Sequence, residues 1–326
     1  MGVPILIKRY QMYYILFLIV TVLVLSGCNS TDDQRITSVG MLVENSINDQ
    51  TWGNKGYQGL LQIKEAFDVD VYFKEEIKTQ QDVNRAVEEF AGKGVNVIFG
   101  HSSTYGAMFK KINRSYPNIH FIYFNGGYHD DNLTSLHFSS HAMGFFGGMV
   151  AGKMTETDQI GLIAAYEWQP EIEGFYEGVN FENPNASIHM EFVNNWDDSE
   201  QALNLYRQIN EQNVDVYYPA GDTFSVSVIN EIKQANKYAI GFVTDQSELG
   251  ENTVLTSTVQ HVDRLYLLAA NKFNQGELDG GVLTYDFQDD VISLGTFSTE
   301  VPEYYKTYIK EQVNLYKETG LLPNER

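Results

Sequence analysis

Polar side chains follow five predicted strands, at the point where each strand ends. The loops in question begin at Glu44, Gly100, Asn125, Pro219 and Thr244. Their carboxylate, amide and hydroxyl groups hydrogen-bond sugar hydroxyls and base edges well. Each loop alone is typical of turns and helix N-caps, which use the same residue types. Five such loops at one end of two sheets favour a binding site.

Three tryptophans stand among polar neighbours rather than in apolar strands, namely Trp52, Trp168 and Trp196. A Trp on a polar loop can supply a flat surface on which a ring compound stacks. The alternative is a partly buried residue of a lid. Composition alone favours neither.

The signals for enzyme chemistry are weak. His137 and His141 have the i,i+4 spacing of a zinc-binding helix, but Phe138 stands where that motif requires Glu. The sequence contains no G-x-S-x-G elbow and no G-x-x-x-x-G-K-[ST] loop. We therefore expect no enzyme, no metal and no cofactor. The segment Gly144–Gly152 is glycine-rich but apolar, which favours close helix packing over phosphate binding.

Short β-branched or aromatic runs alternate with amphipathic helical stretches from Ile36 onward. The expected strands are 37–43, 70–73, 95–99, 120–124, 135–138, 160–164, 188–193, 214–218, 239–243 and 254–257. The alternation runs twice and predicts an α/β fold with two doubly wound parallel-sheet lobes, covered by helices on both faces. Because parallel sheets bind ligands at the carboxyl ends of their strands, a ligand would lie between the lobes.

The N-terminus has the pattern of a lipoprotein signal peptide. Lys8 and Arg9 precede an apolar run over 13–25, which ends at Leu25-Ser26-Gly27-Cys28. The run is shorter than the roughly 20 residues of a membrane-spanning helix. The last four residues resemble the bacterial lipobox, in which the cysteine is lipid-modified. The alternative is an uncleaved anchor in which the chain's single cysteine is incidental.

These patterns divide the chain into five parts. We expect a signal peptide over 1–27, a tether over 28–35, an N-terminal lobe over 36–138, a C-terminal lobe over 139–243, and crossover segments with terminal helices over 244–326. Lipidation at Cys28 would hold the protein on the extracytoplasmic face of the cell membrane.

The chain is strongly acidic. It has 22 Lys and Arg against 43 Asp and Glu in 326 residues, a formal charge of −21. Loss of Lys8 and Arg9 with the signal peptide would make this charge −23. Nucleic-acid binding requires a basic footprint, so direct contact with DNA or RNA is not expected. The acidity also favours a neutral ligand over an anionic one.

Six segments are similar in sequence to one protein family. They are Gly40-Met41-Leu42-Val43, Ile47–Gly59, Gly144–Gly148, Tyr218–Asp222, Thr244–Gln246 and Val254–Gln260. The chain resembles the basic membrane protein family of substrate-binding lipoproteins, whose nucleoside-binding members are called PnrA-like. It is most similar to a branch described as positive regulators of competence. The resemblance implies a type I periplasmic-binding-protein-like fold, with two lobes joined by crossovers and a ligand between them.

The resemblance also implies ligand-contacting residues. Trp52 and Trp196 stand where relatives carry an aromatic pair that sandwiches the base. The other expected site residues are Glu44, Asp49, Asn125, Gly221, Asp222, Asp245 and Gln260. Val43 and Val243 replace acids of the family, and Gln260 replaces a lysine. Each ligand hydroxyl left unsatisfied costs about 1–3 kcal/mol, so we expect weakened purine-nucleoside affinity or a different ligand.

The expected function is that of a lipid-anchored binding protein which closes on a neutral, nucleoside-like ring compound. An ABC transporter permease is the candidate partner, and a regulatory role in competence would be indirect. Three alternatives remain open at this stage. They are a sugar-binding protein of an ABC transporter, a hydrolase, and a scaffold that has lost its ligand and signals through protein contacts.

Overall fold

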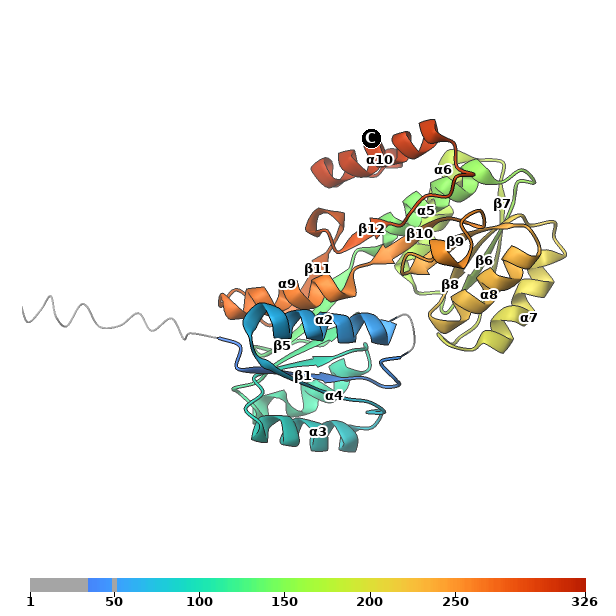
Figure 1. Cartoon of the computed structure of the whole chain (residues 1–326). Coiled ribbons are helices and arrows are strands. Elements are labelled where there is room, and N and C mark those ends of the chain that lie inside the picture. Colours follow the sequence, from blue (N-terminus) through green and yellow to red (C-terminus); the bar gives the residue numbers. More distant parts are fainter. Residues whose placement is uncertain (1–34, 49–51) are drawn as a thin grey trace, which may run out of the picture.

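The computed structural model describes residues 35–48 and 52–326, and Figure 1 labels its elements. The predicted signal peptide, the lipidation site Cys28 and the candidate ligand residue Asp49 lie outside the described residues. Within these two ranges, no helix combines the length and the low polarity that crossing a bilayer requires.

The first lobe is built on a parallel sheet with the strand order β11-β5-β4-β3-β1-β2. Its strands are β1 (Ser38–Leu42), β2 (Asp70–Lys74), β3 (Val97–Gly100), β4 (His120–Phe124), β5 (Leu133–Phe138) and β11 (Gly281–Tyr285). Its helices are α2 (Trp52–Phe67), α3 (Gln80–Gly92), α4 (Tyr105–Ile112), η1 (Asn113–Ser115) and α9 (Val262–Asn274). Helices α2 and α9 pack together on one face of the sheet, and α3 and α4 cover the other.

Successive residues of one strand enter different cores. In β3, Val97 and Phe99 pack with residues of α2 and α9, whereas Ile98 packs with residues of α3 and α4. Alternate side chains of a strand point to opposite faces, so a strand covered on both sides is apolar throughout. This is why the sequence shows continuous apolar runs at these strands rather than an apolar–polar alternation.

The second lobe has the strand order β12-β10-β9-β8-β6-β7, parallel except for the antiparallel pair of β10 and β12. Its strands are β6 (Gln159–Ala164), β7 (Ser187–Phe192), β8 (Val216–Ala220), β9 (Tyr238–Val243), β10 (Val254–Gln260) and β12 (Ile292–Leu294). Its helices are α5 (Ser140–Met154), α6 (Pro170–Glu182), α7 (Ser199–Asn210), α8 (Thr223–Gln234), η2 (Ser247–Leu249), η3 (Phe287–Asp289), α10 (Glu303–Thr319) and η4 (Pro323–Glu325).

All ten expected strands are present, with ends shifted by at most three residues. The sequence analysis missed β11 and β12. They are edge strands of five and three residues with one buried residue each, so neither is a run of buried apolar residues. The pair His137 and His141 is split between β5 and α5, so it does not share the helix face that its spacing suggested.

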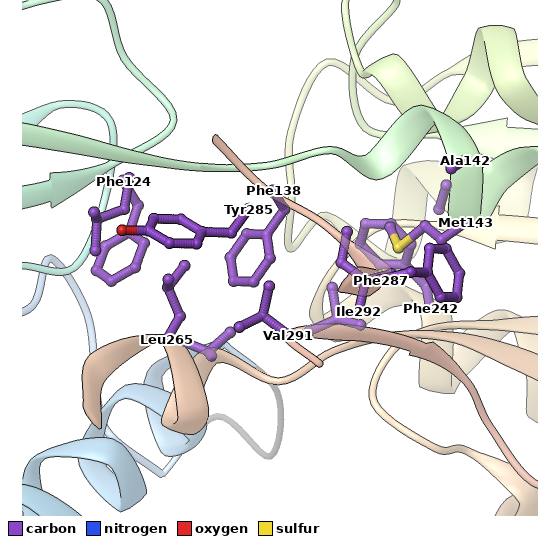
Figure 2. Packing of buried hydrophobic residues seen from close by; sticks show 14 of the residues in the cluster. Phe124, Phe138, Ala142, Met143, Phe242, Leu265, Tyr285, Phe287, Val291 and Ile292 are labelled. Atoms are coloured by element: carbon purple, nitrogen blue, oxygen red, sulfur yellow. The ribbon is translucent and has the colours of Figure 1, made fainter. Parts of the chain in front are cut away.

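Three segments cross between the lobes: 138–140 from β5 to α5, 260–262 from β10 to α9, and 285–292 from β11 to β12. One buried hydrophobic cluster continues along these crossovers from lobe to lobe. Figure 2 shows Phe124 and Leu265 at the first lobe, Phe138 and Val291 at the crossovers, and Phe242 in the second lobe. The lobes are therefore joined by a packed apolar core as well as by the backbone.

The glycine-rich segment on α5 packs closely against α6, which confirms the sequence prediction. A Cβ atom placed on Gly148 would lie 2.2 Å from the carbonyl oxygen of Phe175, and one on Gly178 would lie 1.9 Å from that of Phe145. Both distances are far below van der Waals contact, so the two backbones touch directly. Only glycine allows this spacing.

Candidate functional site

Trp52 begins α2 and is held at the carboxyl end of the first sheet. Its indole Nε1 donates a hydrogen bond to the carbonyl oxygen of His101 at 3.1 Å. The ring stacks on the His101 imidazole, with centroids 4.8 Å apart and an interplanar angle of 14°, and lies edge-on to Phe124 and Phe138. The half-buried indole is therefore fixed by three rings and one hydrogen bond.

His101 holds Trp52 in place through ring stacking and hydrogen bonds. Its Nε2 lies 2.7 Å from the carbonyl oxygen of Trp52, and its Nδ1 lies 2.9 Å from the hydroxyl of Tyr266 on α9. A carbonyl oxygen can only accept, so Nε2 carries the proton and Nδ1 accepts from the tyrosine. A Cβ on Gly56 would lie 2.5 Å from this imidazole, which explains the glycine on α2. The sequence placed His101 in a polar loop but gave no sign of this supporting role.

Two further expected residues lie at the same edge of the first sheet. Glu44 follows β1, and its carboxylate accepts a hydrogen bond from the hydroxyl of Thr104. Asn125 follows β4, is exposed, and has a left-handed φ of 55°. Asn tolerates this region better than most residues because its short polar side chain makes local hydrogen bonds. Its backbone amide donates to Leu136 at 2.9 Å.

Trp196 lies at the carboxyl end of the second sheet, within a cluster of three aromatic rings. Tyr166 and Trp168 stack with centroids 5.2 Å apart, and both lie edge-on to Trp196, at 5.4 and 5.9 Å. Trp168 is 63% exposed. We call Tyr166, Trp168 and Trp196 the aromatic platform. The sequence singled out Trp168 by its polar neighbours, but neither it nor Tyr166 was among the expected site residues.

Gly221 and Asp222 follow β8 and lie next to the backbone of Trp196. The amide of Asp222 donates to the carbonyl oxygen of Trp196 at 3.1 Å. A Cβ on Gly221 would lie 2.0 Å from the ring of Phe224, so a larger residue would displace this buried ring. The loop after β8 therefore holds the backbone of Trp196.

Asp245, after β9, is occupied by groups of its own lobe. Its carboxylate accepts hydrogen bonds from the amide and hydroxyl of Thr296, at 2.9 and 2.7 Å, and from the amide of Ser247 at 3.2 Å. Partial burial opposes ionisation, but these hydrogen bonds outweigh it and lower the pKa of Asp245. Gln260 is buried at the end of β10, where the chain crosses to α9.

The expected residues thus gather at the carboxyl ends of strands, in two groups. Trp52, Glu44 and Asn125 belong to the first lobe, and Trp196 stands with its neighbours in the second. Among the described residues, no ring contact joins Trp52 to Trp196. The ring contacts that hold Trp52 come from the first lobe, and those that hold Trp196 come from the second.

A buried carboxylate that the sequence analysis missed links the platform to a crossover. The side-chain oxygen of Gln169 accepts from the amide of Tyr166 at 2.7 Å, and its amide group donates to Glu171 at 2.8 Å. The other carboxylate oxygen of Glu171 accepts from the hydroxyl of Ser140, the first residue of α5, at 2.9 Å. Burial raises the pKa of Glu171 above its usual value. In the sequence, an acid after Pro170 predicts only a helix start.

Comparisons with known proteins bear on this arrangement. The sequence profile described as "ABC transporter substrate-binding protein PnrA-like" matches residues 36–325. The transcriptional activator protein med of Bacillus subtilis is 47% identical over 302 residues, which are 92% of this chain and 95% of the relative. A crystal structure of a transcriptional activator of the comK gene from Bacillus halodurans has 44% identity and a TM-score of 0.83, covering 88% of this chain and 99% of that one.

A purine-binding protein of Brucella abortus is 22% identical over 290 residues, which are 87% of this chain and 82% of the relative. The matches confirm the expected resemblance and the expected fold of two parallel α/β lobes. They also place the chain among binding proteins rather than enzymes, as the weak catalytic motifs predicted. The chain belongs to the PnrA-like family of ABC transporter substrate-binding proteins.

Proposed function

We propose that this protein binds a neutral ring compound, nucleoside-like in shape, between its two lobes. The observation that carries the proposal is the aromatic platform, whose Trp168 is 63% exposed at the carboxyl end of the second sheet. A flat ligand that covers this exposed apolar ring removes it from water, which lowers the free energy of the complex. Base–aromatic stacking contributes about 1–3 kcal/mol per base.

The polar groups around the rings suit a neutral ligand with hydroxyls. Glu44 and Asp222 offer acceptors, and the exposed amide of Asn125 offers both a donor and an acceptor. The formal charge of −21 disfavours an anionic ligand at this acidic edge. The purine-binding relative from Brucella abortus supports a ligand of the nucleoside class.

Ligand binding would close the two lobes. We propose that residues 36–138 and 139–243 form the cores of two bodies, completed by segments from 244–326, which move about the three crossovers. A ligand that contacts both lobes stabilises the closed state by its higher affinity for that state. The hydrogen bonds from Gln169 through Glu171 to Ser140 would carry a change at the platform to the crossover at 138–140.

The regulatory role that we propose is indirect. Two relatives are named as transcriptional activators, but a chain with 43 acidic and 22 basic residues would repel DNA. A lipid anchor at Cys28 would hold the protein outside the cytoplasm, with a transporter permease or another membrane protein as its partner.

A Cys28→Ala variant should then move from the membrane fraction to the soluble fraction when cells are fractionated. Unchanged membrane association would contradict the anchor.

Exchange of Trp168 for alanine tests the ligand site. We expect Trp168→Ala to weaken nucleoside binding about tenfold to hundredfold, because a stacking surface is lost. The ring is mostly exposed, so the melting temperature without ligand should change little. The measurement is a titration of the purified protein with inosine, adenosine, free bases and sugars. A ligand at 100 times its Kd should also add about 2.7 kcal/mol of stability.

Tyr304→Ala is the matched control, because this ring is 65% exposed and lies on α10, outside the aromatic platform. It should leave nucleoside binding unchanged. If no nucleoside or base binds, or if Trp168→Ala binds as tightly as the wild type, the proposal is wrong. Stabilisation by sugars alone would favour the sugar-binding alternative.

A further inference from the structure

A cavity of about 590 Å³ lies between α10 and the segment that contains η3 and β12. None of the aromatic platform and of the nine expected ligand residues lines it, although the carboxylate of Asp245 accepts hydrogen bonds from Thr296 in its wall. In Figure 1, α10 lies at the top of the view above β12, and the lining also includes Arg264 on α9 of the first lobe. A volume of this size fits a small organic molecule. We call it the α10 cavity.

The α10 cavity concentrates positive charge in an acidic chain. Arg264, Lys306, Lys310 and Lys317 line it, four of the chain's 22 basic residues, against two lining acids, Asp290 and Glu303. The lining therefore carries a formal charge of +2 within a chain of −21. Such a local excess attracts an anion even where the whole molecule repels one.

The four cations are not all neutralised by their neighbours. Lys306 is only 10% exposed at its side chain and pairs with the exposed Glu303 at 2.6 Å, while Lys317 pairs with Asp290 at 2.6 Å. Arg264 donates to the backbone carbonyl of Asp290 at 3.1 Å. Lys310 forms no ion pair within the described residues. Arg264 and Lys310 can therefore meet an incoming anion without breaking an ion pair.

The remaining wall of the cavity is largely apolar. Its apolar lining residues are Phe287, Ile292, Leu294, Phe297, Ile309 and Val313. Figure 2 shows Phe287 and Ile292 together where the packed core reaches the second lobe. An apolar wall beside a cationic rim matches a molecule with an apolar body and one charged end. An inorganic ion would leave the apolar wall uncovered.

We propose that the α10 cavity binds a small organic anion with an apolar body, such as an aromatic carboxylate. The carboxylate would meet Lys310 and Arg264, and the apolar body would cover Phe297 and Val313. This site differs in place and in ligand charge from the site between the lobes. The proposal therefore stands or falls independently of nucleoside binding.

Calorimetric titration of the purified protein with 2-naphthoate tests the proposal. Two matched probes are 2-naphthalenemethanol, which is neutral, and acetate, which lacks the aromatic body. We expect naphthoate to bind at least tenfold more tightly than either, with an affinity that falls as salt is added. Lys310→Gln should weaken naphthoate binding at least fivefold, and Arg264→Gln combined with it should weaken binding further. Binding of the alcohol should not change.

Two variants distinguish the α10 cavity from other sites. Lys111→Gln removes the same charge from an exposed position on α4 and should leave naphthoate binding unchanged. Trp168→Ala should also leave it unchanged, because the platform lies outside the cavity. The proposal is wrong if naphthoate does not bind or binds no better than the alcohol. It is equally wrong if Trp168→Ala abolishes naphthoate binding, or if Lys111→Gln weakens it as much as Lys310→Gln.

Discussion

Replacement of Gly178 by alanine is expected to lower the free energy of unfolding by about 3 kcal/mol or more. The added Cβ would lie 1.9 Å from the carbonyl oxygen of Phe145 and 3.0 Å from the amide nitrogen of Met149. Overpacking typically costs about 1–3 kcal/mol, and the upper end applies because both opposing atoms belong to the backbone of α5. Neither helix can relieve the overlap by a side-chain rotation. The helices must separate, and buried contacts along both are lost.

Urea denaturation followed by circular dichroism measures this effect, and Gly92→Ala is its control. Gly92 ends α3, and a Cβ there would meet no atom within 4 Å. Alanine at that position should leave stability unchanged or raise it by about 0.5–1 kcal/mol, because glycine loses more backbone entropy on folding. If Gly178→Ala unfolds at the same urea concentration as Gly92→Ala, the close packing of α5 on α6 is refuted.

Removal of the buried carboxylate is expected to have the second largest effect. Glu171→Ala should lower the free energy of unfolding by about 2–6 kcal/mol, because the Ser140 hydroxyl and the Gln169 amide each lose a partner at about 1–3 kcal/mol. Glu171→Gln should be tolerated. Its oxygen can accept from Gln169, and its amide can donate to the hydroxyl oxygen of Ser140.

The two variants also separate the charge of Glu171 from its hydrogen bonds. Burial raises the pKa of Glu171 above the ordinary value of 4.5. As the pH rises, the unfolded chain therefore loses the proton of this carboxyl group at a lower pH than the folded protein does. Stability contributed by this group is therefore present below about pH 4.5 and is lost as the pH rises toward the folded pKa. Glutamine does not ionise, so the Glu171→Gln variant does not lose stability in this way as the pH rises. Its stability relative to the wild type should rise between pH 4 and pH 7 in urea titrations, and a fall would contradict the assignment.

Much of the fold could be predicted from local sequence. Eight of the ten expected strands lie inside the sheets, where burial on both faces makes them largely apolar and visible without any knowledge of their partners. The other two, β2 and β7, are partly exposed edge strands. The edge strands β11 and β12 could not be predicted, since their pairing depends on neighbours 147 and 32 residues earlier in the chain. Gly281 pairs with Thr134, and Ile292 pairs with Gln260.

The candidate site was predictable only in part. Trp52 and Trp196 could be selected by residue type, by position after a strand, and by resemblance. The residues that hold these two tryptophans in place could not be predicted. His101 beneath Trp52 and Tyr166 beside Trp168 are contacts between segments distant along the chain or around a loop, and their residue types carry no signal of the partner.

The sequence by itself determined the class of this protein: an acidic two-lobed binding protein with a lipobox-like cysteine, weak catalytic motifs and a glycine segment made for helix packing. These properties depend on composition and on short-range patterns, which the chain carries in any conformation. The tertiary structure alone decided where charge is buried. Glu171 lies in the core beside Ser140, and Lys306 lines a cationic cavity in a chain of net negative charge. Burial and electrostatic environment are set by distant segments that meet only in the folded chain.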